Sequence, residues 1–342
     1  MKKTGQIIIG IFMLWLSAFS SPPLSAETGQ IKLSYANFMQ PGTFPCVQME
    51  RWKTEVEKAA SGKVGIKTFP NSTLLGAKDM MDGVIAGKAD IGLICTAYEP
   101  ERFILPNAVS LPLGIPDART GSLVLLEIYK KYKPESLARV KVLTVFTNAP
   151  ANIMSKKPVK TIEDVKGMNL KASGGGGDIL KAWGANLVDI PMSETPAAME
   201  KGLAEGLFSS LDVMKGLNFA EHCRYVAITD TVVYPFAVIM NSERWNGLPE
   251  DVKKIMENLS ADHAIWTGKY EDDYVKEAIA WSKEKYQVEV TEFDELYRAK
   301  FNYLLWPLTQ KWMEKAKAEG LPAGDIVMDI RRFIKQHAGQ KK

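Results

Sequence analysis

The chain has few of the residues that build metal centres or disulfide frameworks. Its 342 residues include only three cysteines and three histidines. The cysteines, Cys46, Cys95 and Cys223, are too few for a disulfide framework, and no Cys-x-x-Cys sequence occurs. His222 neighbours Cys223, but a metal site needs three or four ligands in a defined geometry. We therefore expect a structural role for this pair and no bound metal.

Motifs of catalysis and of cofactor binding are missing as well. No HExxH, GxSxG, Walker or GxGxxG sequence occurs. Adjacent acidic residues such as Asp272 and Asp273 point to different faces of a helix, so they do not form a pair of catalytic carboxylates. A formal net charge of +3 is too small to predict nucleic-acid binding. These absences predict that the protein is not an enzyme, holds no cofactor and has no nucleic-acid partner.

Long apolar runs are confined to the N-terminus, where residues 1–26 have the order of a secretory signal peptide. Two lysines precede an apolar run over residues 7–19, and Leu24-Ser25-Ala26 ends in a small residue at the cleavage site. The run is shorter than the ~20 residues that span a bilayer. Because Pro22-Pro23 follows it, a membrane anchor is the weaker interpretation. We expect a soluble, periplasmic mature protein that begins near Glu27.

The remaining sequence alternates between strand-like and helix-like segments. With 46% hydrophobic and 24% charged residues it has the composition of a globular protein, and its length suggests two domains. Strands are expected over residues 31–36, 64–69, 91–95, 140–146, 187–190 and 231–240, and helices over 44–60, 80–86 and 195–202. This alternation predicts parallel sheets covered by helices on both faces. A second α/β unit is expected to begin near residue 148, and the chain to return to the first unit near 235.

A long helix is expected from about residue 250 to 285. Pro249 and the acidic pair Glu250-Asp251 form a strong helix start, and apolar residues then recur at intervals of three or four. Such a helix is roughly 50 Å long, which exceeds the width of one small domain. It can therefore span two lobes and couple them. The alternative is two shorter helices broken near Gly268.

Several short motifs occur in a specific order along the mature chain. They are NSTLLG at 71–76, MMDGVIAGKAD at 80–90, KPVKTIEDVKG at 157–167, AWGA at 182–185, IPMSE at 190–194 and WNGLPEDVK at 245–253. Each is weak alone. As an ordered set they resemble the extracytoplasmic solute-binding proteins of tripartite ATP-independent periplasmic (TRAP) transporters, the C4-dicarboxylate-binding type.

The resemblance implies an α/β fold with two lobes, like that of periplasmic binding proteins, and a long helix spanning both lobes. Residues 27–148 would form lobe I, with 235–274 returning to it. Residues 149–234 would form lobe II, with 275–342 packing on it and across the lobes. The lobes would close over a small organic solute, leave it chemically unchanged and deliver it to TRAP membrane permease subunits that use an ion gradient, usually of sodium.

The sequence departs from the family where a substrate carboxylate is normally held. Lys171 stands in place of the family's arginine, which keeps the charge but loses the planar fork. Ser209 replaces an asparagine, Met192 replaces a common aromatic residue, and Ala151 stands near a second arginine of some members. We therefore expect a monocarboxylate, aromatic or apolar, or a neutral solute. The alternative for Lys171 is a side chain that points to solvent.

Further candidates for the ligand site follow strand ends, where open α/β sheets bind ligands. They are Asn37 and Phe38, Tyr98 and Glu99, Ser173 and Gly174, and Tyr234. The backbone N–H groups of residues 174–177 offer an anion site, although the glycine run equally fits a turn that allows close backbone approach. If Glu99 faces the cleft, a cationic or hydroxylated ligand is favoured.

Two other functions remain open on the sequence. A binding protein of an ATP-driven importer has the same lobed architecture. A secreted enzyme on a two-lobed scaffold is disfavoured because no nucleophile–base or metal constellation is visible, although such sites assemble in space.

Overall fold

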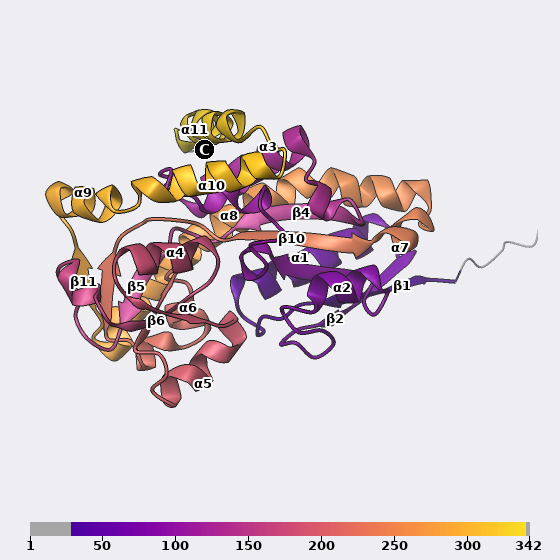
Figure 1. The fold of residues 1–342 in the computed structure, drawn as a ribbon. Helices are drawn as coiled ribbons and strands as arrows, with labels where there is room; N and C mark the ends of the chain where they lie inside the picture. Colours follow the sequence, from indigo (N-terminus) through magenta and orange to yellow (C-terminus); the bar gives the residue numbers. More distant parts are fainter. Residues whose placement is uncertain (1–28, 340–342) are drawn as a thin grey trace, which may run out of the picture.

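Two mixed β-sheets organise residues 29–339, the part of the chain that the computed structural model describes (Figure 1). The first sheet has the order β2-β1-β3-β10-β4 and the second the order β11-β9-β5-β8-β6-β7. The first contains β1 (Ile31–Ala36), β2 (Val64–Phe69), β3 (Ile91–Cys95), β4 (Val140–Thr147) and β10 (Pro235–Asn241). The second contains β5 (Asn152–Ser155), β6 (Asn169–Ala172), β7 (Asn186–Asp189), β8 (Gly206–Ser209), β9 (Tyr225–Ile228) and β11 (Glu289–Glu292). Each sheet with its helices forms one lobe.

The expectation of purely parallel sheets is wrong for the strands next to the lobe crossings. β10 runs antiparallel to β3 and β4, and β5 runs antiparallel to β8 and β9. The reason is the path of the chain, which leaves the first lobe after β4 and returns to it after β9. The two crossing segments pair with each other, because Ala151 N donates to Val232 O (2.7 Å) and Thr231 N donates to Ala151 O (3.2 Å). This double connection links the two lobes, and we refer to it below as the hinge region.

Helices cover the sheets as the alternating pattern predicts. In the first lobe they are α1 (Phe44–Ala59), α2 (Met80–Ile85), α3 (Ala118–Tyr132) and α7 (Ser242–Asn246), and in the second α4 (Gly175–Ala182), α5 (Thr195–Glu200) and α6 (Val213–Gly216). α1 has Pro45 in its first turn, and Asp117 caps α3 by accepting from Thr120 N (2.6 Å). The buried faces of these helices form an apolar core with the sheets.

Helix α8 (Glu250–Tyr286) is one uninterrupted helix of 37 residues, or ~56 Å at 1.5 Å per residue. It packs on α1, α3 and β4 of the first lobe and then on α6 of the second. Gly268 does not break it. A Cβ atom there would lie 2.5 Å from the Cα atom of Arg119, so the glycine permits the close approach of α8 to α3. The prediction of a helix spanning both lobes is confirmed, and the two-helix alternative is wrong.

The C-terminal helices run along both lobes (Figure 1). They are α9 (Glu295–Tyr303), α10 (Trp306–Ala318) and α11 (Ala323–Ala338). α9 is tied to the second lobe, where Trp183 Nε1 donates to Phe301 O (3.2 Å). α10 reaches the first lobe, where Trp312 Nε1 donates to Ile104 O (3.2 Å), and α11 packs on α3.

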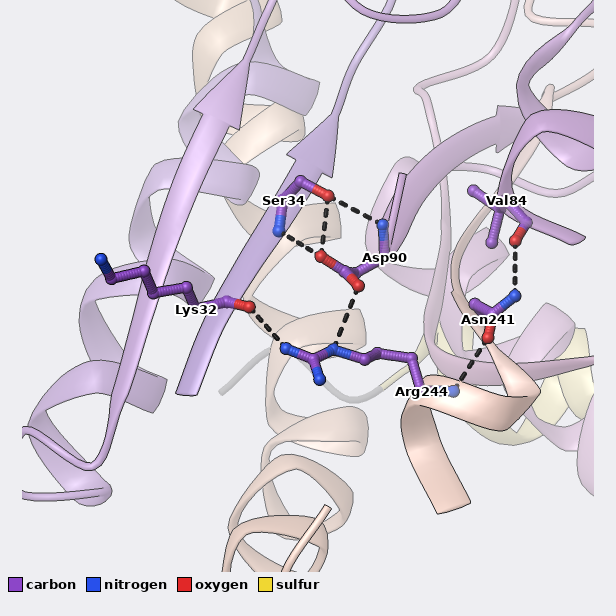
Figure 2. A network of polar contacts seen from close by, with 6 residues as sticks. All are labelled: Lys32, Ser34, Val84, Asp90, Asn241 and Arg244. Atoms are coloured by element: carbon purple, nitrogen blue, oxygen red, sulfur yellow. Dashed lines mark hydrogen bonds and ion pairs between the residues drawn. The ribbon is translucent and has the colours of Figure 1, made fainter. Parts of the chain in front are cut away.

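A cluster of polar contacts lies in the first lobe at the end of β10 that is remote from the lobe connection (Figure 2). Asp90 accepts from Ser34 N (2.7 Å) and Ser34 Oγ (2.8 Å), and its other oxygen pairs with Arg244 Nε (3.1 Å). Arg244 also donates to Lys32 O (2.7 Å), and Asn241 donates to Val84 O (2.9 Å). We call these residues the Asp90 cluster. They join the first strand to the returning strand.

The predicted signal peptide, residues 1–26, lies outside the described part of the chain. Within residues 29–339, no helix combines the length and the apolar character that a membrane crossing requires.

Candidate functional site

A small cavity of about 40 Å³ lies where the two lobes meet at the hinge. The first lobe contributes the loop after β1 and the start of α1. It also contributes the end of β3, the turn after β3 and the start of β10. The second lobe contributes the ends of β6 and β8 and the turn before α5. The lining residues are Met39, Phe44, Pro45, Cys95, Tyr98, Asn148, Lys171, Ser173, Met192, Ser209, Asp212, Val213, Tyr234 and Phe236. The cavity thus lies at strand ends, and both lobes enclose it.

Lys171 is the most unusual residue of the cavity. It is 2% exposed, so the interpretation of a solvent-facing side chain is wrong. Across residues 29–339 no acidic side chain lies within 4.0 Å of its ammonium group, and no hydrogen bond of that group is found. Burial lowers the pKa of Lys171 to about 8, although Cys95 and Asp189 act in the opposite direction. An unpaired buried ammonium is costly in free energy, and a ligand carboxylate would remove that cost.

Aromatic and apolar side chains make up most of the remaining wall. The rings of Phe44 and Phe236 pack edge to face with centroids 5.8 Å apart, and Met39, Met192 and Val213 complete the apolar surface. Burial raises the pKa of the Cys95 thiol to about 12, so this residue acts as a small apolar group rather than as a nucleophile. Apart from Asp212 and a few polar groups, the side chains around the Lys171 ammonium group are therefore apolar or aromatic.

Two tyrosines hold the cavity together through their hydroxyl groups. Tyr98 Oη of the first lobe accepts from Met192 N of the second (3.1 Å). Tyr234 Oη donates to Phe208 O (3.0 Å), and its backbone N–H donates to Asn148 Oδ1 (2.6 Å). Burial raises the pKa of both phenols, so they stay protonated and uncharged. The Tyr98 bond is made only when the lobes are together.

The glycine run serves close packing between the lobes. A Cβ atom at Gly174 would lie 2.8 Å from Ala97 O, and one at Gly176 would lie 2.1 Å from Tyr234 Oη. Gly176 N donates to Ser173 O (3.1 Å) and Gly177 N to Gly174 O (2.9 Å), so these two groups are not available to an anion. Two of the four N–H groups of the anion site expected across residues 174–177 are thus engaged within the chain, and the close-approach interpretation agrees with the geometry.

Six of the ten residues predicted for the site line the cavity: Tyr98, Lys171, Ser173, Met192, Ser209 and Tyr234. Gly174 lies at the lobe interface beside it. Asn37 is fully buried behind the wall, where its amide donates to Pro45 O (3.1 Å) and accepts from Met39 N (2.9 Å). Phe38 packs on the ring of Tyr98, and Glu99 pairs with Arg102 (3.1 Å) outside the cavity. Glu99 therefore gives no indication of a cationic ligand.

The sequence analysis missed eight lining residues: Met39, Phe44, Pro45, Cys95, Asn148, Asp212, Val213 and Phe236. A signal existed for two groups of them. Phe44 and Pro45 begin the first helix directly after the first strand, and Phe236 lies in the returning strand two residues beyond Tyr234. No sequence pattern marks Asp212, because the turn between β8 and α6 places it in the cavity and the course of that turn is not evident from the sequence.

Comparisons with known proteins identify the family. Residues 36–316 match the family described as DctP, bacterial extracellular solute-binding protein, family 7. A crystal structure of a TRAP periplasmic solute-binding protein from Desulfovibrio salexigens is 47% identical, with a TM-score of 0.82 over 92% of this chain and 98% of that chain. One from Rhodoferax ferrireducens in complex with copurified benzoate is 21% identical, with a TM-score of 0.86 over 90% and 99% of the two chains.

A curated relative agrees with these structures. The C4-dicarboxylate-binding periplasmic protein DctP of Rhodobacter capsulatus is 25% identical over 337 residues, which cover 90% of this chain and 93% of the relative. The predicted two-lobed fold and the predicted family are both confirmed, and neither the ATP-driven importer nor the secreted enzyme is favoured. The chain belongs to the bacterial extracellular solute-binding proteins of family 7 and is a solute-binding protein of the TRAP type.

Proposed function

We propose that the protein captures a small organic monocarboxylate between its lobes, with the carboxylate on Lys171 and an apolar or aromatic body against Phe44 and Phe236. The lobes close over the ligand about the double connection near residues 148–151 and 229–234. This is a hinge motion that ligand contacts to both lobes favour.

The observation that carries the proposal is the buried, unpaired ammonium group of Lys171. It lies in a cavity between the lobes whose walls are otherwise mostly apolar. A single cation pairs well with one carboxylate, and the cavity has no second cation for a dicarboxylate. Relatives of the same fold support this ligand class, since a structure from Bordetella bronchiseptica has bound mandelate and the Rhodoferax ferrireducens structure has copurified benzoate.

The loaded protein then delivers its ligand to the membrane permease subunits of a TRAP transporter, which use an ion gradient. Residues 1–26 direct export and are cleaved, so the mature protein acts in the periplasm. We assign residues 27–148 and 235–274 to the first lobe and 149–234 to the second, with 275–342 joining both. Family membership and the composition of the two sheets support this assignment.

A thermal-shift screen of monocarboxylates, dicarboxylates, sugars and polyols tests the proposal, because a ligand that binds only the folded state raises the melting temperature. We expect monocarboxylates to give the largest shifts. Lys171→Ala should then weaken the best ligand about ten-fold or more in calorimetric titration, the scale of a lost charge-assisted contact.

The matched control is Lys181→Ala, which removes an exposed lysine of α4 that does not line the cavity. It should leave affinity unchanged. Unchanged affinity in Lys171→Ala would remove Lys171 from the site, and a best ligand of the succinate type would contradict the choice of a monocarboxylate.

A further inference from the structure

Asp212 is a second charged residue in the wall of the cavity, and the proposed capture of a monocarboxylate leaves it without a role. It is 2% exposed and follows β8 at the start of α6. No basic side chain lies within 4.0 Å of it in residues 29–339. Instead its carboxyl group contacts the hydroxyl of Ser210, and this hydroxyl also bonds to Glu271 Oε1 of α8 at 2.7 Å.

The contacts among Asp212, Ser210 and Glu271 require one more proton than the serine hydroxyl supplies. The hydroxyl of Ser210 has one hydrogen to donate, yet it contacts two carboxyl groups. One of the two acids must therefore be protonated and donate to the hydroxyl oxygen. Glu271 is fully buried, and its Oε2 atom has no hydrogen-bond partner. A proton on Glu271 removes the cost of an unpaired buried charge there.

The groups around the two acids favour a negative charge on Asp212 and the proton on Glu271. The backbone N–H of Val213 favours the ionised form of the Asp212 carboxyl, and within residues 29–339 Ala149 N is the only backbone donor to Glu271, at 3.2 Å. Asp272 is occupied by Ala118 N (2.7 Å) and Arg119 N (3.0 Å), and Lys215 pairs with Glu277. Burial raises the pKa of Asp212 to about 6 and that of Glu271 well above its usual range, which agrees with a neutral Glu271.

We infer that Asp212 is a specificity-determining residue of the ligand cavity, which favours monocarboxylates that carry a hydrogen-bond donor, such as a hydroxyl group, and rejects dicarboxylates. The inference rests on the proposed capture of a carboxylate by Lys171. A ligand hydroxyl donates to the Asp212 carboxylate, whereas a second ligand carboxylate meets a like charge in a medium that screens it poorly. Glu271 and Ser210 act through Asp212 as positioning residues.

Two matched series of probes test the inference by calorimetric titration at neutral pH. One is propanoate, lactate and methylmalonate, and the other is benzoate, 3-hydroxybenzoate and benzene-1,3-dicarboxylate. Each series compares a parent acid with its hydroxyl and its carboxyl derivative. In the series that fits the cavity we expect the hydroxyl acid to bind about ten-fold tighter than the parent and the diacid at least ten-fold weaker, the scale of one charge-assisted contact.

Asp212→Asn should bring the hydroxyl acid to within about threefold of its parent and improve the diacid relative to the parent about ten-fold. Asp178→Asn is the matched control, because it removes one acidic charge of α4 outside the cavity. It should leave both ratios as in the unaltered protein. The ratios of the unaltered protein also test the inference if Asp212→Asn does not fold, since a diacid that binds as tightly as its parent would overturn it.

Lys171→Met separates the two proposals. If it abolishes binding while Asp212→Asn leaves both ratios within twofold of the unaltered protein, the role of Asp212 is wrong and the proposed function stands. If Lys171→Met binds the carboxylates as well as the unaltered protein does, the proposed function fails, and the role of Asp212 fails with it.

Discussion

The Asp90 cluster and the ligand cavity both contain charged groups, but those groups differ in burial and in pairing. Asp90 is half-buried and Arg244 is 42% exposed, whereas Lys171 is 2% exposed. In the cluster, Asp90 receives two hydrogen bonds from Ser34 and one ion pair from Arg244 (Figure 2). In the cavity, Lys171 is as well buried as the protein core and has no partner among the described residues. The cluster is thus complete in the structure as it stands, whereas the cavity is not.

This difference separates a structural role from a binding role. A charge whose hydrogen bonds and ion pairs are made within the chain stabilises the fold, and removing it leaves its less exposed partners without an acceptor. A buried charge without partners destabilises the empty protein, so it persists only where a ligand supplies the missing partner. The comparison predicts that substitutions in the two regions affect different measurements.

The largest effect on stability is expected in the Asp90 cluster. Asp90→Ala leaves Ser34 N without its acceptor and removes the partner of Arg244, whose guanidinium solvent can reach, so the free energy of unfolding should fall by about 1 to 2 kcal/mol. Denaturant titration measures this change, and ligand affinity should remain the same. Asp82→Ala is the control, because its side chain is 72% exposed and its ion pair with Arg102 contributes at most about 0.5 kcal/mol. Equal losses in both variants would contradict the comparison.

A smaller effect is expected at Tyr98, which joins the lobes without bearing a charge. Tyr98→Phe leaves Met192 N without its acceptor in the closed form only, so every ligand should bind about fivefold more weakly, or about 1 kcal/mol. Calorimetric titration with a monocarboxylate and a neutral analogue checks whether the loss is uniform. Tyr129→Phe is a suitable control, since Tyr129 lies in the first lobe away from the cavity. A loss confined to the carboxylate would give Tyr98 a role in charge recognition instead.

The sequence predicts most of the fold because local patterns determine most of its elements. The strands expected over 31–36, 64–69 and 91–95 occur with those bounds, and Pro249 with its acidic neighbours correctly begins the long helix. The directions of β5 and β10 could not be predicted in this way. They depend on where the chain crosses between lobes, and the apolar pattern of a strand is the same in either direction.

The site is predicted less completely, for a related reason. Lys171 was found because a motif places it at the position of a family arginine, and it lines the cavity. Asp212 carries no motif, and its role depends on Glu271, which lies 59 residues away in the sequence but shares the same serine hydroxyl. Glu99 follows its strand as Tyr98 does, yet it turns to Arg102, and only packing distinguishes the two.

The ionisation of Lys171 distinguishes a carboxylate-binding lysine from an ordinary one. NMR titration of isotopically labelled lysine side chains follows this ammonium group, with Lys171→Met used to assign its signal. We predict a pKa of about 8 for Lys171 in the empty protein and a clearly higher pKa with a monocarboxylate bound, because the ligand stabilises the charged form. Affinity should accordingly fall as the pH rises above about 8, where the empty protein loses this proton. An ordinary lysine pKa near ~10.4 that does not change when the ligand binds would contradict the account.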